Sequence, residues 1–115
     1  MQQLPDTTAP QILAVNTQAS GANGVITLAA PTDGSQHVID QVIWSYAAAP
    51  NTGGMTISGI ANSAGSAITL TIDITAAGHD DIKFGSAGLR AVKNTAVVVT
   101  LIDGSQDKEL NVIYR

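Results

Sequence analysis

The side-chain types of a nucleophilic triad occur together in one short stretch of this chain. His37 has Asp33, Ser35 and Asp40 within four residues of it. A working triad is assembled by geometry, usually from distant segments, and it needs an oxyanion-binding feature beside the nucleophile. Here all four residues crowd one turn, and no such feature accompanies them. We therefore expect His37 to be an ordinary histidine at the start of a strand.

A second candidate is the run His79-Asp80-Asp81, whose side chains are all possible metal ligands. Consecutive residues of an extended backbone point to opposite sides, so at most two of the three would converge on one ion. Calcium takes six to eight oxygen ligands, and the spacing of an EF-hand loop is absent. We interpret the run as a solvated acidic turn. The glycine-rich stretches 53–54 and 85–88 lack the lysine and the following helix of a phosphate-binding loop, so they are interpreted as turns too.

Aromatic residues and carboxylates on strands offer a third possibility. Trp44 and Tyr46 share one face of a strand candidate and could stack against a sugar, although a single tryptophan in an apolar strand is more often a core residue. Asp40 and Asp73 could in principle form an acid–base pair, but most strand carboxylates face water. We therefore predict that the chain is not an enzyme, with no catalytic residue, no cofactor and no metal site.

Composition limits the partners as well. The 115 residues carry 5 Lys+Arg against 9 Asp+Glu, for a formal net charge of -4. Five scattered cations make no basic stripe, which argues against nucleic acid and against an anionic membrane surface as partners. No apolar run approaches the roughly 20 residues of a transmembrane helix. The chain has no cysteine, which excludes disulfides, thiolate metal sites and cysteine nucleophiles.

The surface is also short of charge. Charged residues make up 12% of the chain, about half of the ~25% typical of globular proteins. Alanine, threonine, glycine, serine and asparagine take the vacated positions. A surface of this kind is typical of a protein that neighbours cover, so the composition favours a component of an assembly.

The elements that position these residues are short strands. Apolar or alternating runs separated by turn residues predict strands over 11–17, 25–30, 37–46, 55–60, 67–75, 95–103 and 108–114, with weaker candidates at 81–84 and 89–92. No stretch has a sustained helical period. About eight short antiparallel strands without a helix predict an all-β, single-domain β-sandwich of the jelly-roll type. We expect an extended N-terminal arm over residues 1–10 and the jelly-roll domain over 11–115.

Three of these strand candidates predict which side chains are buried. In 67–75, four aliphatic residues alternate with polar ones, which indicates one buried and one wet face: Ile68, Leu70, Ile72 and Ile74. In 37–46, strict alternation puts on one face Val38, Asp40, Val42, Trp44 and Tyr46. The other face then carries Ile39, Gln41, Ile43 and Ser45. The run 95–103 is almost continuously apolar, so we expect it to be buried on both sides.

The tetrapeptide Asp-Gly-Ser-Gln occurs at 33–36 and at 103–106, which we interpret as reuse of turn chemistry.

The order of strands and turns resembles a known group of proteins. The similarity runs through 37–46, then Pro50 and Gly53-Gly54, and on through 70–78, 94–101 and 110–115. Over roughly residues 11–115 the chain resembles small capsid decoration, or cement, proteins of tailed double-stranded DNA bacteriophages. The resemblance implies a jelly roll bound to the outer surface of the expanded head. It also implies two partners, the major capsid protein and copies of the chain itself in a dimer or trimer, with a clamping role against internal DNA pressure.

If the resemblance holds, the arm is the expected contact with the capsid. An extended arm can add backbone to an exposed strand edge, and the residues that we expect to bind are Leu4, Pro5, Pro10 and Ile12. The alternative is a head-fibre or tail-tip β module that binds carbohydrate or a host surface. That alternative predicts exposed Trp44 and Tyr46, whereas a decoration protein predicts a buried Trp44.

Overall fold

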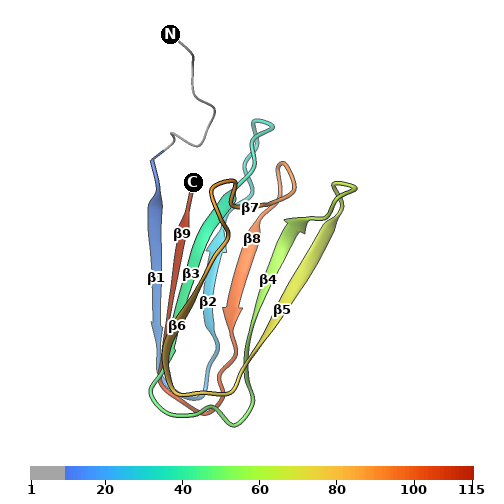
Figure 1. The fold of residues 1–115 in the computed structure, drawn as a ribbon. Helices are drawn as coiled ribbons and strands as arrows, with labels where there is room; N and C mark the ends of the chain where they lie inside the picture. The colour runs from blue at the N-terminus through green and yellow to red at the C-terminus, as the bar shows by residue number, and fades with distance from the viewer. Residues whose placement is uncertain (1–9) are drawn as a thin grey trace.

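The structure of the protein, a computed structural model, describes residues 10–115 (Figure 1). Leu4 and Pro5, two of the expected binding residues, lie outside this range. The described residues form nine strands: β1 (Ile12–Gln18), β2 (Gly24–Leu28), β3 (Val38–Tyr46), β4 (Gly53–Ala61), β5 (Ala67–Ile74), β6 (Gly78–Lys83), β7 (Leu89–Arg90), β8 (Val97–Leu101) and β9 (Lys108–Tyr114). No helix long and apolar enough to cross a membrane is found in this part of the chain.

The strands form two antiparallel sheets that pack face to face. One sheet has the order β1-β9-β3-β6, with β7 pairing beside β6 on β3, and the other has the order β2-β8-β4-β5. The pairs β1–β9, β2–β8, β3–β6 and β4–β5 are nested, as if one long hairpin with its turn after β4 were wrapped around a core. This connectivity is that of a jelly roll. The expected all-β sandwich is therefore confirmed.

The core lies between the sheets and is built from alternate residues of each strand. The alternation expected in 67–75 is found from residue 69 onward: Ile74 is buried, Leu70 and Ile72 are half-buried, and the polar residues between them are exposed. Ile68 is 38% exposed, so its expected burial is wrong. The largest fully buried side chains of the described residues are Tyr46, Ile39, Met55, Ile57, Ile60, Leu101, Leu110, Val42, Val97, Val99 and Val112. Burial of this aliphatic set is the main favourable term that holds the two sheets together.

The expected faces of 37–46 are only partly right, because β3 contains a bulge. Its pairing with β9 shifts between Ile39 and Gln41, so that Asp40 is the extra residue. A bulge of this kind turns the preceding residues over by one step. Ile39 is therefore fully buried with Val42, whereas Val38 is only half-buried. Strict alternation placed Ile39 on the face opposite to Val42. This prediction is wrong for the first three residues of the strand, Val38 to Asp40.

The expectation that 95–103 is buried on both sides is also wrong. β8 lies in the middle of its sheet between β2 and β4, and Val97, Val99 and Leu101 face the core. The intervening Val98 and Thr100 are half-buried on the outer face. The reason is that a sandwich has only two layers, so the outer face of a central strand has flanking strands beside it but no sheet above it.

Candidate interaction surfaces

The side of the sandwich formed by β1 and β2, which we call the uncharged edge, is its most apolar exposed feature. These two strands end their respective sheets and contain no charged residue. Ile12, Leu13 and Val15 on β1 are 51%, 59% and 54% exposed, and Val25 on β2 is 42% exposed. No described strand pairs with the free side of β1. Unpaired backbone next to exposed aliphatic side chains is a template for pairing with another strand.

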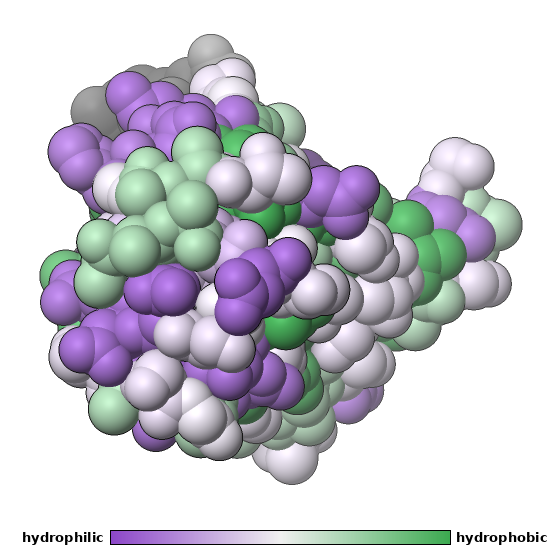
Figure 2. Space-filling view, turned by 90° about the horizontal axis from the view of Figure 1, so that it is seen from below, coloured by the Kyte–Doolittle hydropathy of each residue, from purple (hydrophilic) through white to green (hydrophobic). Residues whose placement is uncertain are grey.

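The opposite side of the sandwich differs in its charge. It is formed by β5 and β6, and these strands carry Asp73, His79, Asp80, Asp81 and Lys83. Charged residues on edge strands hinder pairing with further strands. The β4–β5 hairpin also projects sideways from the sandwich here (Figures 1 and 2). The two sides are therefore not equivalent, and the uncharged edge is the side suited to strand addition.

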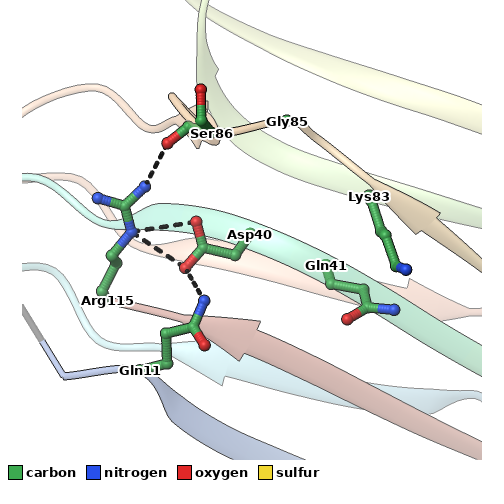
Figure 3. Close-up of a pocket in the computed structure, with 7 residues that line it drawn as sticks. All are labelled: Gln11, Asp40, Gln41, Lys83, Gly85, Ser86 and Arg115. Atoms are coloured by element: carbon green, nitrogen blue, oxygen red, sulfur yellow. Dashed lines mark hydrogen bonds and ion pairs between the residues drawn. The ribbon is translucent and has the colours of Figure 1, made fainter. Parts of the chain in front are cut away.

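A network of polar contacts holds the start of β1 in place. Gln11 Nε2 donates to Asp40 Oδ2 at 3.0 Å, and Arg115 Nε donates to both Asp40 oxygens at 3.0 Å (Figure 3). Arg115 also donates to the Ser86 carbonyl oxygen. The Arg115 and Asp40 side chains are only 8% and 11% exposed, so this ion pair is largely buried. The β3 bulge is what places Asp40 here, because it inserts that residue between two paired positions.

These residues line a shallow hollow of about 340 Å³ at the upper end of the sheet. Its lining is Gln11, Asp40, Gln41, Lys83, Gly85, Ser86 and Arg115. The strongest polar groups in it, Asp40 and Arg115, already bind each other. The contacts at this hollow therefore hold the start of β1 in place. They also set the direction in which the chain runs from residue 10 into this strand. Pro10 is exposed at this point, and Ile12 follows on the uncharged edge.

The structure does not bring the triad-type residues together. Ser35 Oγ and its backbone N–H both donate to Asp33 Oδ1, which closes a local turn and lowers the pKa of Asp33. The His37 ring nitrogen Nε2 lies 2.7 Å from the Ala29 carbonyl oxygen instead. Asp40 is held by Arg115. His37 therefore lies directly before β3 and does not meet Ser35 and Asp40 in a triad.

The acidic run at 79–81 is a strand, not the expected turn. His79, Asp80 and Asp81 belong to β6, where Asp80 lies opposite Trp44 and Asp81 opposite Ile43. Their side chains thus alternate between the two faces, and Asp81 accepts a hydrogen bond from Gln41. Among residues 10–115, no group of three or more His, Asp or Glu side chains is placed to hold a metal ion.

The aromatic pair is part of the core. Trp44 is 7% exposed and Tyr46 is 1% exposed, so neither presents a ring face for stacking. The Tyr46 hydroxyl donates to the Ile102 carbonyl oxygen, and burial raises the pKa of Tyr46. Asp73, which could have paired with Asp40, lies on β5 in the other sheet and lines a separate hollow of about 190 Å³ beside Trp44. The interpretation of Trp44 as a core residue is confirmed.

Lys108 has a structural role that the sequence does not indicate. The ammonium group of Lys108 is fully buried at the lower end of the sandwich, where it donates to the Ala22 carbonyl at 2.7 Å, the Ala19 carbonyl at 3.2 Å and Asp103 Oδ1 at 3.0 Å. Asp103 also accepts from the Gly21 N–H at 2.8 Å. Lys108 thereby ties the turn between β1 and β2 to the turn between β8 and β9. Figure 2 looks onto this end and shows hydrophilic side chains interleaved with apolar ones.

The two Asp-Gly-Ser-Gln turns use the same sequence differently. Asp33 in the first copy binds only within its own turn, through Ser35. Asp103 in the second copy reaches across to Gly21 and Lys108, and both hydrogen bonds lower the pKa of Asp103. No signal in the tetrapeptide distinguishes the two copies. The difference comes from Lys108, which follows only the second copy closely.

Comparisons with known proteins reach as far as the architecture. No protein-family model and no curated protein matches the chain. Among solved structures, a "Family 16 Carbohydrate Binding Module-2" aligns over 86% of this chain and 74% of its own, with 9% identity and a TM-score of 0.47. A structure of the disulfide-linked pili of Bacillus endospore appendages aligns over 91% and 82%, with 14% identity and a TM-score of 0.37. A virus-like particle of the Macrobrachium rosenbergii extra small virus aligns over 91% and 77%, with 13% identity and a TM-score of 0.34.

These three structures share a β-rich architecture with the chain. At such identities and TM-scores the likeness transfers no activity, ligand or partner. None of the three is described as a phage decoration protein, so that specific resemblance stays a prediction.

Proposed function

We propose that the chain is a capsid decoration protein, which binds the outside of a phage head and links neighbouring major capsid proteins. The observation that carries the proposal is the start of β1, where Gln11 is bound to Asp40 and Ile12 is half exposed directly after the point where the arm joins the domain. Backbone pairing of the arm with an exposed strand of the capsid protein would supply the affinity. Leu4 and Ile12 would anchor the contact in shallow pockets, on either side of Pro5 and Pro10.

The outer face of the β2-β8-β4-β5 sheet supports a role in flat protein contacts. Across four strands it carries two rows of uncharged residues in cross-strand register: Val25, Thr100, Thr56 and Thr71 in one, and Thr27, Val98, Ser58 and Thr69 in the other. Two rows without charge have a low cost of desolvation when another protein covers them. Each contact between arm and capsid can be weak, because a particle with several such contacts gains by multivalency.

The proposal excludes catalysis, nucleic acid and membranes as the basis of function. It also places the protein on the outer capsid surface of a virion. The carbohydrate-binding alternative needs an exposed aromatic platform, and burial of Trp44 and Tyr46 removes the platform that it relied on.

The proposal is tested first by counting copies of the chain in purified virions by quantitative mass spectrometry. Hundreds of copies per particle are expected for a lattice component. A handful of copies would place the protein at a tail or a single vertex, which overturns the decoration role.

The arm is tested by binding to purified expanded heads. Deletion of residues 1–10 should leave the circular dichroism spectrum and the unfolding midpoint unchanged and abolish binding. Leu4→Asp should weaken binding strongly, whereas Thr7→Asp, which puts the same charge in the same arm, should weaken it much less. Undiminished binding of the truncated protein would show that the arm is not the capsid contact.

A further inference from the structure

We infer that two copies of this chain pair through β1 about a two-fold axis, so that their β1-β9-β3-β6 sheets join into one continuous sheet. The inference names the second copy as the occupant of the uncharged edge and a dimer as the assembly. Only the role assigned to the dimer rests on the proposed function. The existence of the dimer is tested without a capsid.

Charge is the first reason why the occupant is a second copy. A two-fold axis pairs a strand with its own copy in reverse order, and like charges directly opposite each other are destabilising. Of the two free edges of this sheet, β6 would set Asp80 opposite Asp81 of its copy. β1, with the sequence Ile-Leu-Ala-Val-Asn-Thr-Gln, has no charge to repel. Two-fold pairing through β1 therefore brings no like charges together, whereas pairing through β6 does.

The register follows from the pattern of exposed residues. Antiparallel pairing of all seven residues centres the axis on Val15, which then lies opposite its own copy. Leu13 and Val15 face outward from the sheet, because their partners on β9, Ile113 and Asn111, alternate with the buried Leu110 and Val112. The joined sheet therefore gains a central apolar stripe from Leu13 and Val15 of both copies. These side chains are now 59% and 54% exposed. In the pair, Val15 would pack against its own copy, and each Leu13 would pack against Thr17 and diagonally against Val15 of the other copy.

The area is sufficient for a dimer of modest affinity. Seven residues span about 24 Å, and two sheets about 10 Å apart with their outer side chains make an edge about 20 Å thick. The edge therefore buries about 500 Å² per copy and about 1,000 Å² in total, which is near the lower limit for a specific interface. Val25 on the neighbouring β2 lies on the same side and is included in this area.

The geometry also decides how the dimer would act. Because β1 runs antiparallel to its copy, the two arms leave from opposite ends of the joined strands, about 24 Å apart. If the arms bind capsid proteins as proposed, one dimer would hold two of them. An isologous pairing of this kind closes on itself, so it yields a dimer and excludes the trimer.

Sedimentation velocity of the full chain over a concentration series is the first test. We expect a species of twice the 11.7 kDa chain mass. Val15→Lys should weaken the dimer at least about 30-fold, because it removes two apolar contacts and sets two ammonium groups opposite each other. Thr71→Lys, at an exposed outward position on the edge strand β5 of the other sheet, should leave the dimer intact. Mixing Val15→Lys with Val15→Glu should restore a 1:1 dimer.

A second variant keeps the test decisive even if a charge at position 15 disturbs the fold. The chain has no cysteine, so Val15→Cys introduces a single reporter thiol. Residues opposite each other in an antiparallel pair have Cα atoms about 4.5–5.5 Å apart, which suits a disulfide. Val15→Cys should form a covalent dimer under mild oxidation much faster than Thr71→Cys.

Three results would overturn the inference. They are a monomeric wild-type chain at all concentrations, a trimer, or equal cross-linking rates for Val15→Cys and Thr71→Cys. A confirmed dimer with no copies in virions would refute the proposed function and leave the dimer standing. Copies of the chain in virions together with a monomeric chain in solution would refute the dimer and leave the proposed function standing.

Discussion

Replacing Lys108 by methionine removes a cation whose side chain is fully buried and keeps most of the aliphatic stem. The lysine side chain has no exposed surface, and its ammonium group donates three hydrogen bonds. Two of them go to carbonyl oxygens of the turn that joins β1 to β2. The substitution therefore loosens the base of the uncharged edge, and we expect a clear loss of stability.

The size of the loss can be worked out from these contacts. A hydrogen bond from a charged donor contributes about 1.5–3 kcal/mol. Ala19 and Ala22 lie in an exposed turn, where water replaces part of what is lost, so we take about 1.5 kcal/mol for each. Asp103 is 29% exposed and keeps its hydrogen bond from the Gly21 N–H, so we count nothing for its bond to Lys108. The free energy of unfolding should thus fall by about 3 kcal/mol in Lys108→Met. In a domain of this size that corresponds to a drop of about 10–15 °C in the unfolding midpoint.

The assay is urea unfolding followed by circular dichroism, with Lys93→Met as the matched control. Lys93 is exposed, so its replacement should change the free energy of unfolding by less than about 0.5 kcal/mol. The slope of the free energy with urea should stay the same in both variants, since the fold is retained. If Lys108→Met unfolds within about 0.5 kcal/mol of Lys93→Met, the tie between the two turns contributes nothing and the reasoning fails.

Three more predictions follow from single side chains. The pKa of Asp103 is lowered by hydrogen bonds from Lys108 and Gly21, so the ionised carboxylate stabilises the fold above about pH 4, and this contribution is lost as the pH falls through the folded-state pKa. Unfolding midpoints measured from pH 2 to 6 should therefore fall less steeply toward low pH for Asp103→Asn than for the wild type, and parallel curves would contradict this. Gly59 and Gly65 both have a φ of 82°, but of the two only Gly59 would bring a Cβ into collision with a backbone oxygen, that of Ala96. Gly59→Ala should therefore lower the free energy of unfolding in urea by about 1–3 kcal/mol more than Gly65→Ala, and equal losses would count against the close approach. Trp44 should emit at short wavelength, resist quenching by iodide and show no shift on titration with sugars, whereas an emission like that of free tryptophan would mean that it is exposed.

The sequence predicts the strands well where one face is buried and the other is wet. The alternation of β5 and the short runs between turn residues lead to the observed elements with boundary errors of a few residues. These patterns arise because each strand of a two-layer sandwich has one dry side. Turn residues such as those at 33–36 and 103–106 then mark where the chain changes sheet.

The sequence does not predict features that depend on partners distant in the chain. The β3 bulge at Asp40 is set by pairing with β9 and by Arg115, about 75 residues later, which no local pattern records. Lys108 looks like an ordinary exposed lysine until the turn at 19–22 is brought beside it. For the same reason the apolar residues of β1 look like core residues in sequence, and only the strand order places them on an edge.

The pairing of β1 with β9 has a consequence for how the chain folds. Ile12 lies opposite Tyr114, so the first strand acquires its only described neighbour in the sheet when the last one arrives. Long-range pairing of this kind slows folding to milliseconds or seconds. During synthesis β1 must therefore wait, unpaired and without a charge to protect it, until nearly the whole domain has left the ribosome. Aggregation of the nascent chain through β1 is the hazard that this topology brings with it.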